Sequence, residues 1–423
     1  MTEPTGRRVA LVAIVDFPNG VGGDTRRVYM LARSMVSVGL PVTLVIPCGR
    51  GLVEDEHTRR PKETVDGIDV QRLSRRGSYG HTPGLGLGGI LGLFLLRWTS
   101  LFRSLGAIWS LRRQGLGTIY LYQPTFYDGT AYWLLARLLN VSIVADYCDL
   151  SFVEHDQIER SLARRLWALN YRWGMTWLPR RLDKSYVVTR YLAEMFARVV
   201  PGARLGRVPP VVDTAQFAVT PPAGFLAARC GVTASRTVLY AGSFFENEGV
   251  AVLLEAARIV LAATDDLEFV IVGGHPADAL LALRLRVIGW GLEARIRFPG
   301  VAPSLDMPLY FAAADILVAP KTSSVLNRAG FPVKLIEYLS SGRPVVASAV
   351  GDIPLAVQGG VEALLVPPED PAALAQALTT LLCDPVRAAA MAEAGRARVR
   401  REFDVVPVGN YIRAELESLQ CPR

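Results

Sequence analysis

Cysteine and histidine are scarce in this sequence, which has five cysteines and four histidines among 423 residues. The cysteines are scattered, and no two of them form a CxxC pair. This spacing argues against a disulfide framework and a zinc site, and four histidines disfavour a multi-histidine metal centre. We therefore expect no metal ion, and a reducing compartment such as the cytoplasm fits the cysteine content.

Long hydrophobic runs are also missing. The best run covers residues 84–96 and ends at Arg97, short of the ~18 residues that cross a bilayer. The apolar stretch near the N-terminus stops at Asp16, which is typical of a first β-strand and not of a signal peptide. A mean hydropathy of +0.27 excludes a mainly disordered chain. We expect a cytoplasmic protein with two domains of roughly 200 residues each.

Acidic residues are lacking in one part of the chain. None occurs between Asp69 and Asp128, a window that holds seven arginines. Residues 1–213 carry 28 Lys+Arg and 18 Asp+Glu, a net charge of +10. Residues 214–423 carry 18 and 21, a net of −3, so that the halves together give the +7 of the chain. The basic character therefore belongs to the first half.

Two segments of the basic half, 85–113 and 160–184, combine arginines with Trp, Phe and Leu. Such a composition favours contact with an anionic membrane surface and a peripheral attachment at the inner face of the membrane. A solvated basic face, with 85–111 as an interior helix pair, is the alternative. Helix-turn-helix, zinc-finger and RNP signatures are lacking, so we expect no nucleic-acid partner.

Short β-branched runs alternate with longer helical patterns along the chain. The expected strands are 9–15, 42–46, 118–121, 142–145, 184–188, 237–240, 268–272, 296–298, 316–319 and 344–348. This alternation predicts an α/β protein with parallel sheets covered on both faces. Because the pattern restarts after a Pro/Ala-rich stretch, we expect two Rossmann-like, doubly wound domains facing a central cleft. The expected boundaries are a first domain at 1–207, a linker at 208–224, a second domain at 225–402, and a C-terminal helix at 403–423 that packs back on the first domain.

Glycine-rich turns between a strand and a helix are the first candidate ligand sites. One is DFPNGVGGDTRR, in which Gly20, Gly22 and Gly23 let backbone N–H groups approach a ligand. Arg26 and Arg27 add charge at the start of the helix that follows. A second such turn begins at Gly242 in the second domain. Tight packing is the other explanation of such turns. A short predicted helix at 333–339 carries Lys334 and Glu337 on one face, where a surface salt bridge is the simplest interpretation.

Taken in order, these segments resemble the retaining glycosyltransferases of family 4, which have the GT-B fold. The entrance loop with Pro18, Gly20 and Arg26 is similar to that family's, and VPPVVDTAQF resembles its interdomain stretch. FVIVGGHP resembles a family strand and loop. GFPVKLIEYLSSGRPVVAS is the strongest match, close to a subgroup with the pattern P-x-K-L-x-E-Y. The resemblance covers nearly the whole chain.

This resemblance implies a nucleotide-sugar donor bound mainly by the C-terminal domain, an acceptor bound by the N-terminal domain, and transfer with retained anomeric configuration. It implies no cofactor and no essential metal, so positive side chains and helix ends must stabilise the leaving nucleoside diphosphate. The donor-binding residues expected on this basis are Gly22, Gly23, Arg26, Gly242, Ser243, Val301, Lys321, Asn327, Arg328, Lys334, Leu335 and Glu337.

The sequence departs from the family pattern in the second domain. Ser243 and Glu248 stand where the family has an Arg and a Lys that grip the diphosphate, and Ala329 replaces the first of two glutamates. A carboxylate beside a diphosphate repels it. Lys321, Arg328 and Lys334, with Arg26 from the first domain, are the candidates to supply the missing charge, and Lys334 is also a candidate catalytic residue.

On the acceptor side, Asp146, Asp149 and His155 follow a buried strand and are the other candidate catalytic residues. Helix capping or loop hydrogen bonding would equally explain the two carboxylates. Two functions stay open. The first is a glycosyltransferase that acts on a lipid-linked or cell-envelope glycan acceptor. The second is a non-catalytic partner protein of the same shape that binds a nucleotide or a glycan, which the departures at Ser243, Glu248 and Ala329 favour.

Overall fold

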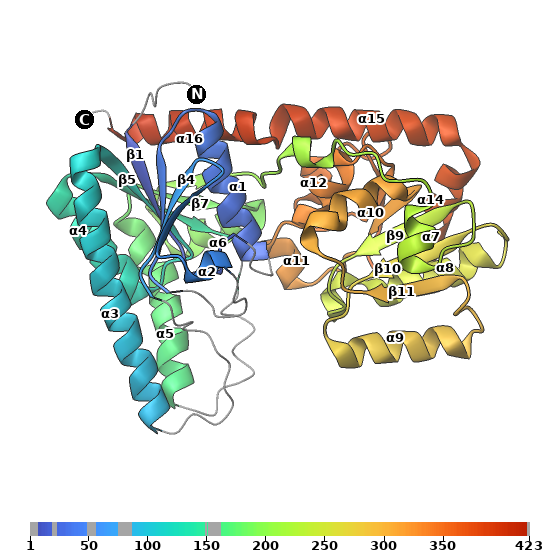
Figure 1. Cartoon of the computed structure of the whole chain (residues 1–423), viewed down its shortest axis with the longest axis horizontal. Helices are drawn as coiled ribbons and strands as arrows, with labels where there is room; N and C mark the ends of the chain where they lie inside the picture. The colour runs from blue at the N-terminus through green and yellow to red at the C-terminus, as the bar shows by residue number, and fades with distance from the viewer. Residues whose placement is uncertain are drawn as a thin grey trace. The chain divides into compact units, whose positions relative to one another are not determined.

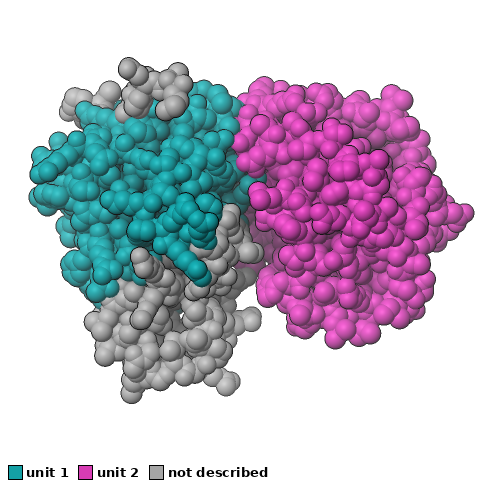
Figure 2. Space-filling view, viewed as in Figure 1, with its two compact units in different colours: residues 1–211, 405–423 teal, residues 212–404 magenta. Residues whose placement is uncertain are grey.

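The computed structural model describes residues 7–18, 23–48, 56–74, 87–148, 150 and 162–420 (Figure 1). The chain divides into two compact units, drawn in teal and magenta in Figure 2. Unit 1 comprises residues 1–211 and 405–423, and unit 2 comprises residues 212–404. Three of the predicted site residues, Gly22, Asp149 and His155, lie outside the described residues.

Unit 1 is built on a sheet with the strand order β3-β4-β2-β1-β5-β6-β7-β8. All neighbours are parallel except β3 and β4, which form an antiparallel hairpin. Asp66 and Gly67 both have positive φ in its two-residue turn, the conformation that an Asp-Gly pair favours. The strands are β1 (Arg8–Val12), β2 (Val42–Ile46), β3 (Lys62–Val65), β4 (Ile68–Arg72), β5 (Leu116–Tyr122), β6 (Ser142–Tyr147), β7 (Lys184–Val187) and β8 (Leu205–Arg207).

Helices cover both faces of this sheet (Figure 1). Helices α1 (Gly23–Ser37) and α16 (Val405–Gln420) pack on each other, so the C-terminal helix belongs to unit 1. Their contact is close, because a Cβ at Gly409 would collide with the carbonyl of Ser34. The other helices of unit 1 are α2 (Glu56–Arg59), α3 (Leu87–Leu111), α4 (Phe126–Leu139), α5 (Leu162–Thr176) and α6 (Arg190–Val199), with 3-10 turns η1 (Arg112–Gln114) and η3 (Leu178–Arg180).

Unit 2 has a fully parallel sheet with the order β11-β10-β9-β12-β13-β14. Numbered within the unit, this is the order 3-2-1-4-5-6 of a doubly wound nucleotide-binding sheet. Unit 1 repeats it with β4, β2, β1, β5, β6 and β7. The strands of unit 2 are β9 (Thr237–Ala241), β10 (Glu268–Val272), β11 (Ile296–Gly300), β12 (Ile316–Ala319), β13 (Val345–Ser348) and β14 (Leu364–Val366).

Alternate residues of the unit 2 strands enter two separate hydrophobic clusters, one on each face of the sheet. Val238 and Tyr240 pack with α8 (Val250–Leu261), α9 (Ala277–Gly289) and α14 (Pro371–Cys383), whereas Leu239 and Ala241 pack on the opposite face. The remaining elements are α7 (Phe225–Cys230), α10 (Met307–Ala313), α11 (Val325–Ala329), α12 (Val333–Ser340), α13 (Ile353–Ala356), α15 (Pro385–Glu402), and the 3-10 turns η4 (Thr214–Phe217), η5 (Glu246–Glu248) and η6 (Ser304–Asp306).

In a doubly wound sheet, ligands bind at the carboxyl ends of the strands, where the strand order reverses. In unit 2 this reversal lies between β9 and β12. The segment that follows β9 contains Gly242, Ser243 and Glu248, and Lys321 follows β12. The topology therefore brings several of the predicted donor-binding residues to one edge of the sheet.

Candidate functional site

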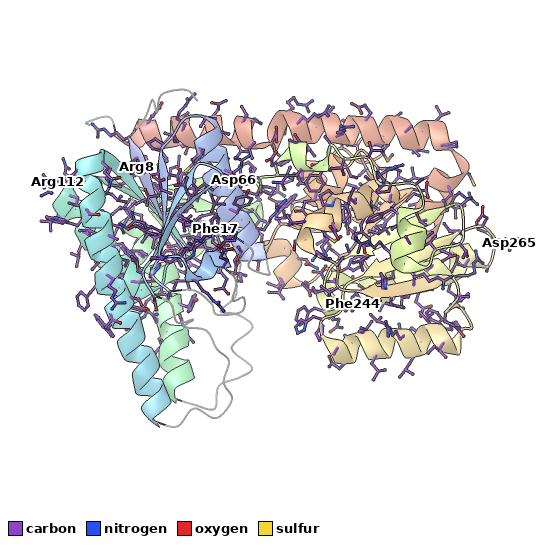
Figure 3. The ribbon with its side chains drawn as sticks, in the orientation of Figure 1. Arg8, Phe17, Asp66, Arg112, Phe244 and Asp265 are labelled. Carbon is purple, nitrogen blue, oxygen red and sulfur yellow. The ribbon has the colours of Figure 1, made fainter. Side chains whose placement is uncertain are left out.

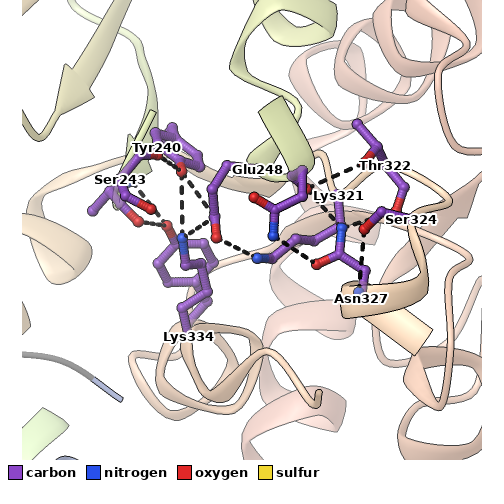
Figure 4. Close-up of polar contacts among 11 residues, drawn as sticks. Tyr240, Ser243, Glu248, Lys321, Thr322, Ser324, Asn327 and Lys334 are labelled. Atoms are coloured by element: carbon purple, nitrogen blue, oxygen red, sulfur yellow. Dashed lines mark hydrogen bonds and ion pairs between the residues drawn. The ribbon is translucent and has the colours of Figure 1, made fainter. Parts of the chain in front are cut away.

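A charged cluster occupies the reversal point of unit 2 (Figure 4). The Glu248 carboxylate lies between two lysines: one oxygen accepts a hydrogen bond from Lys321, and the other lies 2.6 Å from Lys334 Nζ. The Tyr240 hydroxyl, at the end of β9, lies 3.0 Å from the Lys334-bound oxygen of Glu248 and 3.3 Å from Lys334 Nζ. Three separate segments, η5, α12 and the loop after β12, thus meet in one ion-pair network.

Burial and charge act against each other in this cluster. Burial raises the pKa of the Glu248 carboxyl, but the ammonium groups of Lys334 and Lys321 outweigh it and lower this pKa to about 2. Burial and the neighbouring Lys334 ammonium lower the pKa of Lys321 to about 8, although Glu248 acts in the opposite direction. The Glu248 carboxylate is therefore ionised throughout the neutral pH range. The lowered pKa of Lys321 lies just above that range.

Neighbouring loops hold the cluster in place. The Asn327 amide donates to the carbonyl of Asn247 (2.6 Å) and to that of Thr322 (2.9 Å). The Thr322 backbone N–H also donates to the Asn247 carbonyl, at 3.2 Å. Ser324 caps α11 by accepting from the Asn327 backbone N–H. Asn327 therefore fixes the loop that carries Glu248 against the loop that carries Lys321, a structural part that its sequence position did not indicate.

The glycine turn after β9 passes directly beside the cluster. A Cβ at Gly242 would collide with the Lys334 ammonium, and a Cβ at Gly273 would collide with the Gly242 carbonyl. The Ser243 carbonyl accepts a hydrogen bond from the Tyr240 hydroxyl at 2.7 Å. Backbone without side chains thus lines one side of the Lys334 ammonium, as a phosphate-binding turn requires.

The other predicted donor-binding residues of unit 2 are less closely gathered. Glu337 is half-buried on α12, one turn beyond Lys334, and Arg328 is exposed at the end of α11. Val301 follows β11 and is 80% exposed, close to the turn at Gly274. Leu335 is fully buried and belongs to the core. A direct contact of the Leu335 side chain with a donor is therefore excluded in this structure.

In unit 1 the structure gives Asp146 a different part from the predicted one. Its carboxylate is fully buried and forms a two-point ion pair with Arg27, with Nε–Oδ2 at 2.9 Å and Nη2–Oδ1 at 3.1 Å. Arg27 also donates to the carbonyls of Val208 and Pro209. Both carboxylate oxygens are occupied by an arginine, so Asp146 cannot accept a proton from an acceptor hydroxyl in this arrangement. From the sequence, Arg27 was expected to add charge at the start of the helix, and no local pattern revealed that it would be buried against Asp146.

In the entrance turn of unit 1 the structure describes residues 16–18 and the residues from Gly23 onward, where α1 begins. Gly23 is exposed and Arg26 is half-buried in the first turn of α1. Asp24 accepts a hydrogen bond from the Tyr122 hydroxyl at 2.9 Å, which ties the start of α1 to the end of β5. Among the described residues, no group of three or more His, Cys, Asp or Glu side chains is arranged to hold a metal ion.

Residues 235–384 match the family described as Glycosyl transferases group 1. The chain carries a glycosyl transferases group 1 domain. This domain includes the whole charged cluster and all of the unit 2 sheet, and it confirms the family resemblance drawn from the sequence.

Curated relatives are similar to about half of this chain. The chain is 32% identical over 218 residues to a GDP-mannose-dependent alpha-(1-6)-phosphatidylinositol monomannoside mannosyltransferase of Mycolicibacterium smegmatis, covering 51% of this chain and 56% of the relative. It is 34% identical over 185 residues to a phosphatidyl-myo-inositol mannosyltransferase of Mycobacterium leprae, covering 44% and 47%. The chain therefore spans about half the length of these relatives.

Solved structures extend the likeness to the whole fold. Sucrose-phosphate synthase from Thermosynechococcus elongatus matches with a TM-score of 0.69 at 21% identity, covering 98% of this chain and 99% of that one. Anabaena Alr3699/HepE in complex with UDP and glucose also matches with a TM-score of 0.69, at 17% identity, covering 98% and 100%. The chain thus has the predicted GT-B fold, with two Rossmann-like units.

Proposed function

We propose that this protein is a retaining glycosyltransferase that moves a sugar from a nucleoside diphosphate sugar to a lipid-linked or cell-envelope glycan acceptor. The observation that carries the proposal is the pair of lysines at the reversal point of a glycosyl transferases group 1 domain. The names of the relatives support the donor and acceptor classes, because several are GDP-mannose-dependent enzymes acting on phosphatidylinositol mannosides.

The reaction requires stabilisation of a leaving group whose charge grows. As the bond between the sugar and the diphosphate breaks, negative charge collects on the phosphate oxygens, and fixed positive groups nearby lower the barrier. Lys334 meets this need, because it lies in the first turn of α12, beside the glycine turn. We assign Lys334 to the diphosphate and Glu337 to the ribose hydroxyls, and we propose that the nucleotide sugar is a substrate used without a metal cofactor.

Acceptor binding is assigned to unit 1. Because Arg27 forms hydrogen bonds to both carboxylate oxygens of Asp146, the candidate residues that remain for positioning the acceptor hydroxyl are Asp149 and His155. Both stay predictions from the sequence.

A lipid-linked acceptor is supported by one side of unit 1, which we call the α3–α5 face. Large apolar side chains are exposed there on three helices: Trp98, Phe102 and Trp109 on α3, Leu134 and Leu138 on α4, and Leu169 and Trp173 on α5. From Trp98 onward α3 is one-sided, because Leu101, Ser104, Ile108 and Leu111 are buried. Over these described side chains α3 is therefore not an interior helix.

Exposed arginines accompany these apolar groups. Arg103, Arg112 and Arg113 are exposed on α3 and η1, and Figure 3 shows Arg112 where α3 ends. Apolar side chains interspersed with arginines fit an anionic lipid surface, and the cytoplasmic leaflet carries such lipids. We therefore place the protein peripherally at the inner face of the membrane. No described helix is long and apolar enough to span a bilayer.

The activity is tested by incubating the purified protein with UDP-, GDP- and dTDP-sugars and a crude membrane-lipid extract. We expect release of the nucleoside diphosphate from one donor only in the presence of lipid, and retained anomeric configuration of the product by NMR. Tight binding of a donor with no turnover on any lipid would favour the non-catalytic partner protein. Absence of both binding and turnover would contradict the proposal.

Membrane attachment is tested by flotation with vesicles of neutral or anionic phospholipid. We expect flotation with anionic vesicles at low salt and its loss at high salt, since each arginine near an anionic leaflet contributes about 1 kcal/mol. Replacing Arg103, Arg112 and Arg113 with Gln should abolish flotation. The matched control replaces three exposed arginines of unit 2, Arg387, Arg400 and Arg401, with Gln, and it should leave flotation unchanged. Equal recovery with both vesicle types would contradict attachment to an anionic surface.

A further inference from the structure

Glu248 is the residue that the family pattern makes hardest to explain, since it places a carboxylate where a diphosphate binds. In the structure this carboxylate faces two lysines. Its two oxygens are taken up by Lys321 and Lys334, and its side chain is only 11% exposed. The repulsion expected from the sequence alone is therefore cancelled within the protein.

We propose that Glu248 and Lys321 form a positioning pair that orients the Lys334 ammonium toward the donor diphosphate while leaving the cluster with a net positive charge. This inference rests on the proposed function and deepens it, because it assigns parts to two residues that do not themselves touch the substrate. Two ammonium groups and one carboxylate carry a formal charge of +1.

Exposure distinguishes the two lysines. The Lys334 side chain is 18% exposed, whereas that of Lys321 is 9% exposed. Lys334 also has its ammonium against the backbone of the Gly242 turn, and 4.8 Å from the centre of the Tyr240 ring. Lys334 is therefore the ammonium that a phosphate can reach, and Lys321 acts on it through Glu248.

The backbone holds this arrangement rigidly. Gly249 closes η5 with a φ of 73°, and a Cβ there would collide with the carbonyl of Pro320, the residue before Lys321. The left-handed conformation and the close approach both require glycine. The loops that carry Glu248 and Lys321 are thus in direct backbone contact, and this contact holds the two side chains close to each other.

The charge state of Lys321 sets the charge of the cluster. With Lys321 protonated, Glu248 is neutralised by Lys321 and the charge of Lys334 remains available. When Lys321 loses its proton to solvent, Glu248 cancels Lys334 and the formal charge falls to zero. The titratable groups that face Lys321 are Glu248 from η5 and Lys334 from α12, and beyond them Tyr240 from β9; the lowered pKa of about 8 places the change at mildly alkaline pH.

The pairing is tested first without any ligand. The chain has four lysines, Lys62, Lys184, Lys321 and Lys334, so that NMR of protein labelled with carbon-13 in the lysine side chains follows each one. We expect Lys321 to titrate near pH 8 and to shift down by at least about one pH unit in Glu248→Gln, because the compensating charge is lost. Glu268→Gln is the matched control, since Glu268 is a buried, ion-paired carboxylate at the opposite end of the sheet strands. An unshifted Lys321 in Glu248→Gln would overturn the proposal.

The effect on the diphosphate is tested by calorimetric titration with GDP and, separately, UDP. For the wild type we expect affinity to fall as the pH rises through about 8, and for Lys321→Met a weak affinity that does not change over this range. Adding Glu248→Gln to Lys321→Met should restore at least about tenfold of the lost affinity, because Lys334 then has no carboxylate to cancel it. A merely structural part for the pair predicts further loss in the double variant, and that result would overturn the proposal.

The two proposals fail in different ways. If the wild type binds neither GDP nor UDP, and no donor sugar, the proposed function fails while the lysine titration still decides whether Glu248 and Lys321 are coupled. If the wild type binds a nucleoside diphosphate with an affinity that does not depend on pH between 7 and 9, the proposed function stands and the positioning pair is wrong.

Discussion

Both sheets carry a buried ion pair near the carboxyl ends of their strands, but the two pairs differ in their charge balance. In unit 1, Arg27 and Asp146 pair one to one, with 6% and 0% of their side chains exposed. In unit 2, two lysines share Glu248 and one of them keeps 18% exposure. A balanced and fully enclosed pair has no charge left for a ligand, whereas an unbalanced and partly open one does. The comparison therefore distinguishes an ion pair that stabilises the fold from one that can bind a ligand. The sequence alone shows only that charged residues lie near the ends of the strands.

The strongest effect should come from breaking the enclosed pair. Asp146→Asn leaves the Arg27 guanidinium buried without its counter-charge, which typically costs about 3–5 kcal/mol of unfolding free energy. We expect a correspondingly large loss in urea denaturation. Asp69→Asn is the control, because Asp69 is half-exposed in its ion pair with Arg8 and should cost less than about 1 kcal/mol. A stable Asp146→Asn variant with abolished turnover would instead return Asp146 to the catalytic residues.

In unit 2 the corresponding change should affect the reaction more than the fold. Lys334→Ala removes the ammonium nearest to the glycine turn, and the charge that it meets grows in the transition state. We expect kcat to fall by on the order of 10²-fold. This fall should exceed the rise in KM, with both constants measured for the donor that the nucleotide-sugar panel identifies. Lys62→Ala, at an exposed lysine of unit 1, should change neither constant. A rise in KM at constant kcat would restrict Lys334 to ground-state binding.

A smaller effect is expected one turn further along α12. If Glu337 accepts hydrogen bonds from the ribose hydroxyls, Glu337→Ala should raise the donor KM roughly tenfold or more, because bonds to a charged group contribute about 1.5–3 kcal/mol each. In the wild type the donor should have a lower KM than its deoxyribose form, and this difference should disappear in Glu337→Ala. Unchanged affinity and turnover in this variant would remove Glu337 from the site.

The smallest effect concerns stability against pH. The pKa of Lys321 is lowered to about 8 in the folded protein, from 10.5. The unfolded chain therefore binds more protons between these values, and this lysine adds stability as the pH rises through that window. Relative to Lys321→Met, the wild type should gain at most about 1.4 kcal/mol per pH unit. A difference that falls with pH would contradict the assigned direction.

The sequence predicted the architecture well because parallel strands buried on both faces are continuous apolar runs. Each of the ten runs expected to form strands lies at a strand of the structure. The hairpin of β3 and β4 was not predicted, since KETV and IDVQR alternate with polar residues at the sheet edge. The short edge strands β8 and β14, of three residues each, were also missed.

The site was only partly predictable, because its defining contacts are long-range. The motif placed Gly242, Lys321 and Lys334 in the donor site, and the structure brings these residues together. It could not show that Glu248 would pair with a lysine 86 residues away, or that Asp146 would pair with an arginine 119 residues away. Ion pairs of this kind depend on which loops meet at a sheet edge, and a local pattern does not contain that information.

The most direct test of the account is a crystal structure of the protein with the nucleoside diphosphate that it binds. The account predicts a phosphate oxygen within about 3.2 Å of Lys334 Nζ, with Glu248 still bridging the two lysines and the Arg27–Asp146 pair unchanged. A diphosphate more than ~6 Å from Lys334, or bound with Asp146 released from Arg27, would contradict the division between a structural and a binding ion pair.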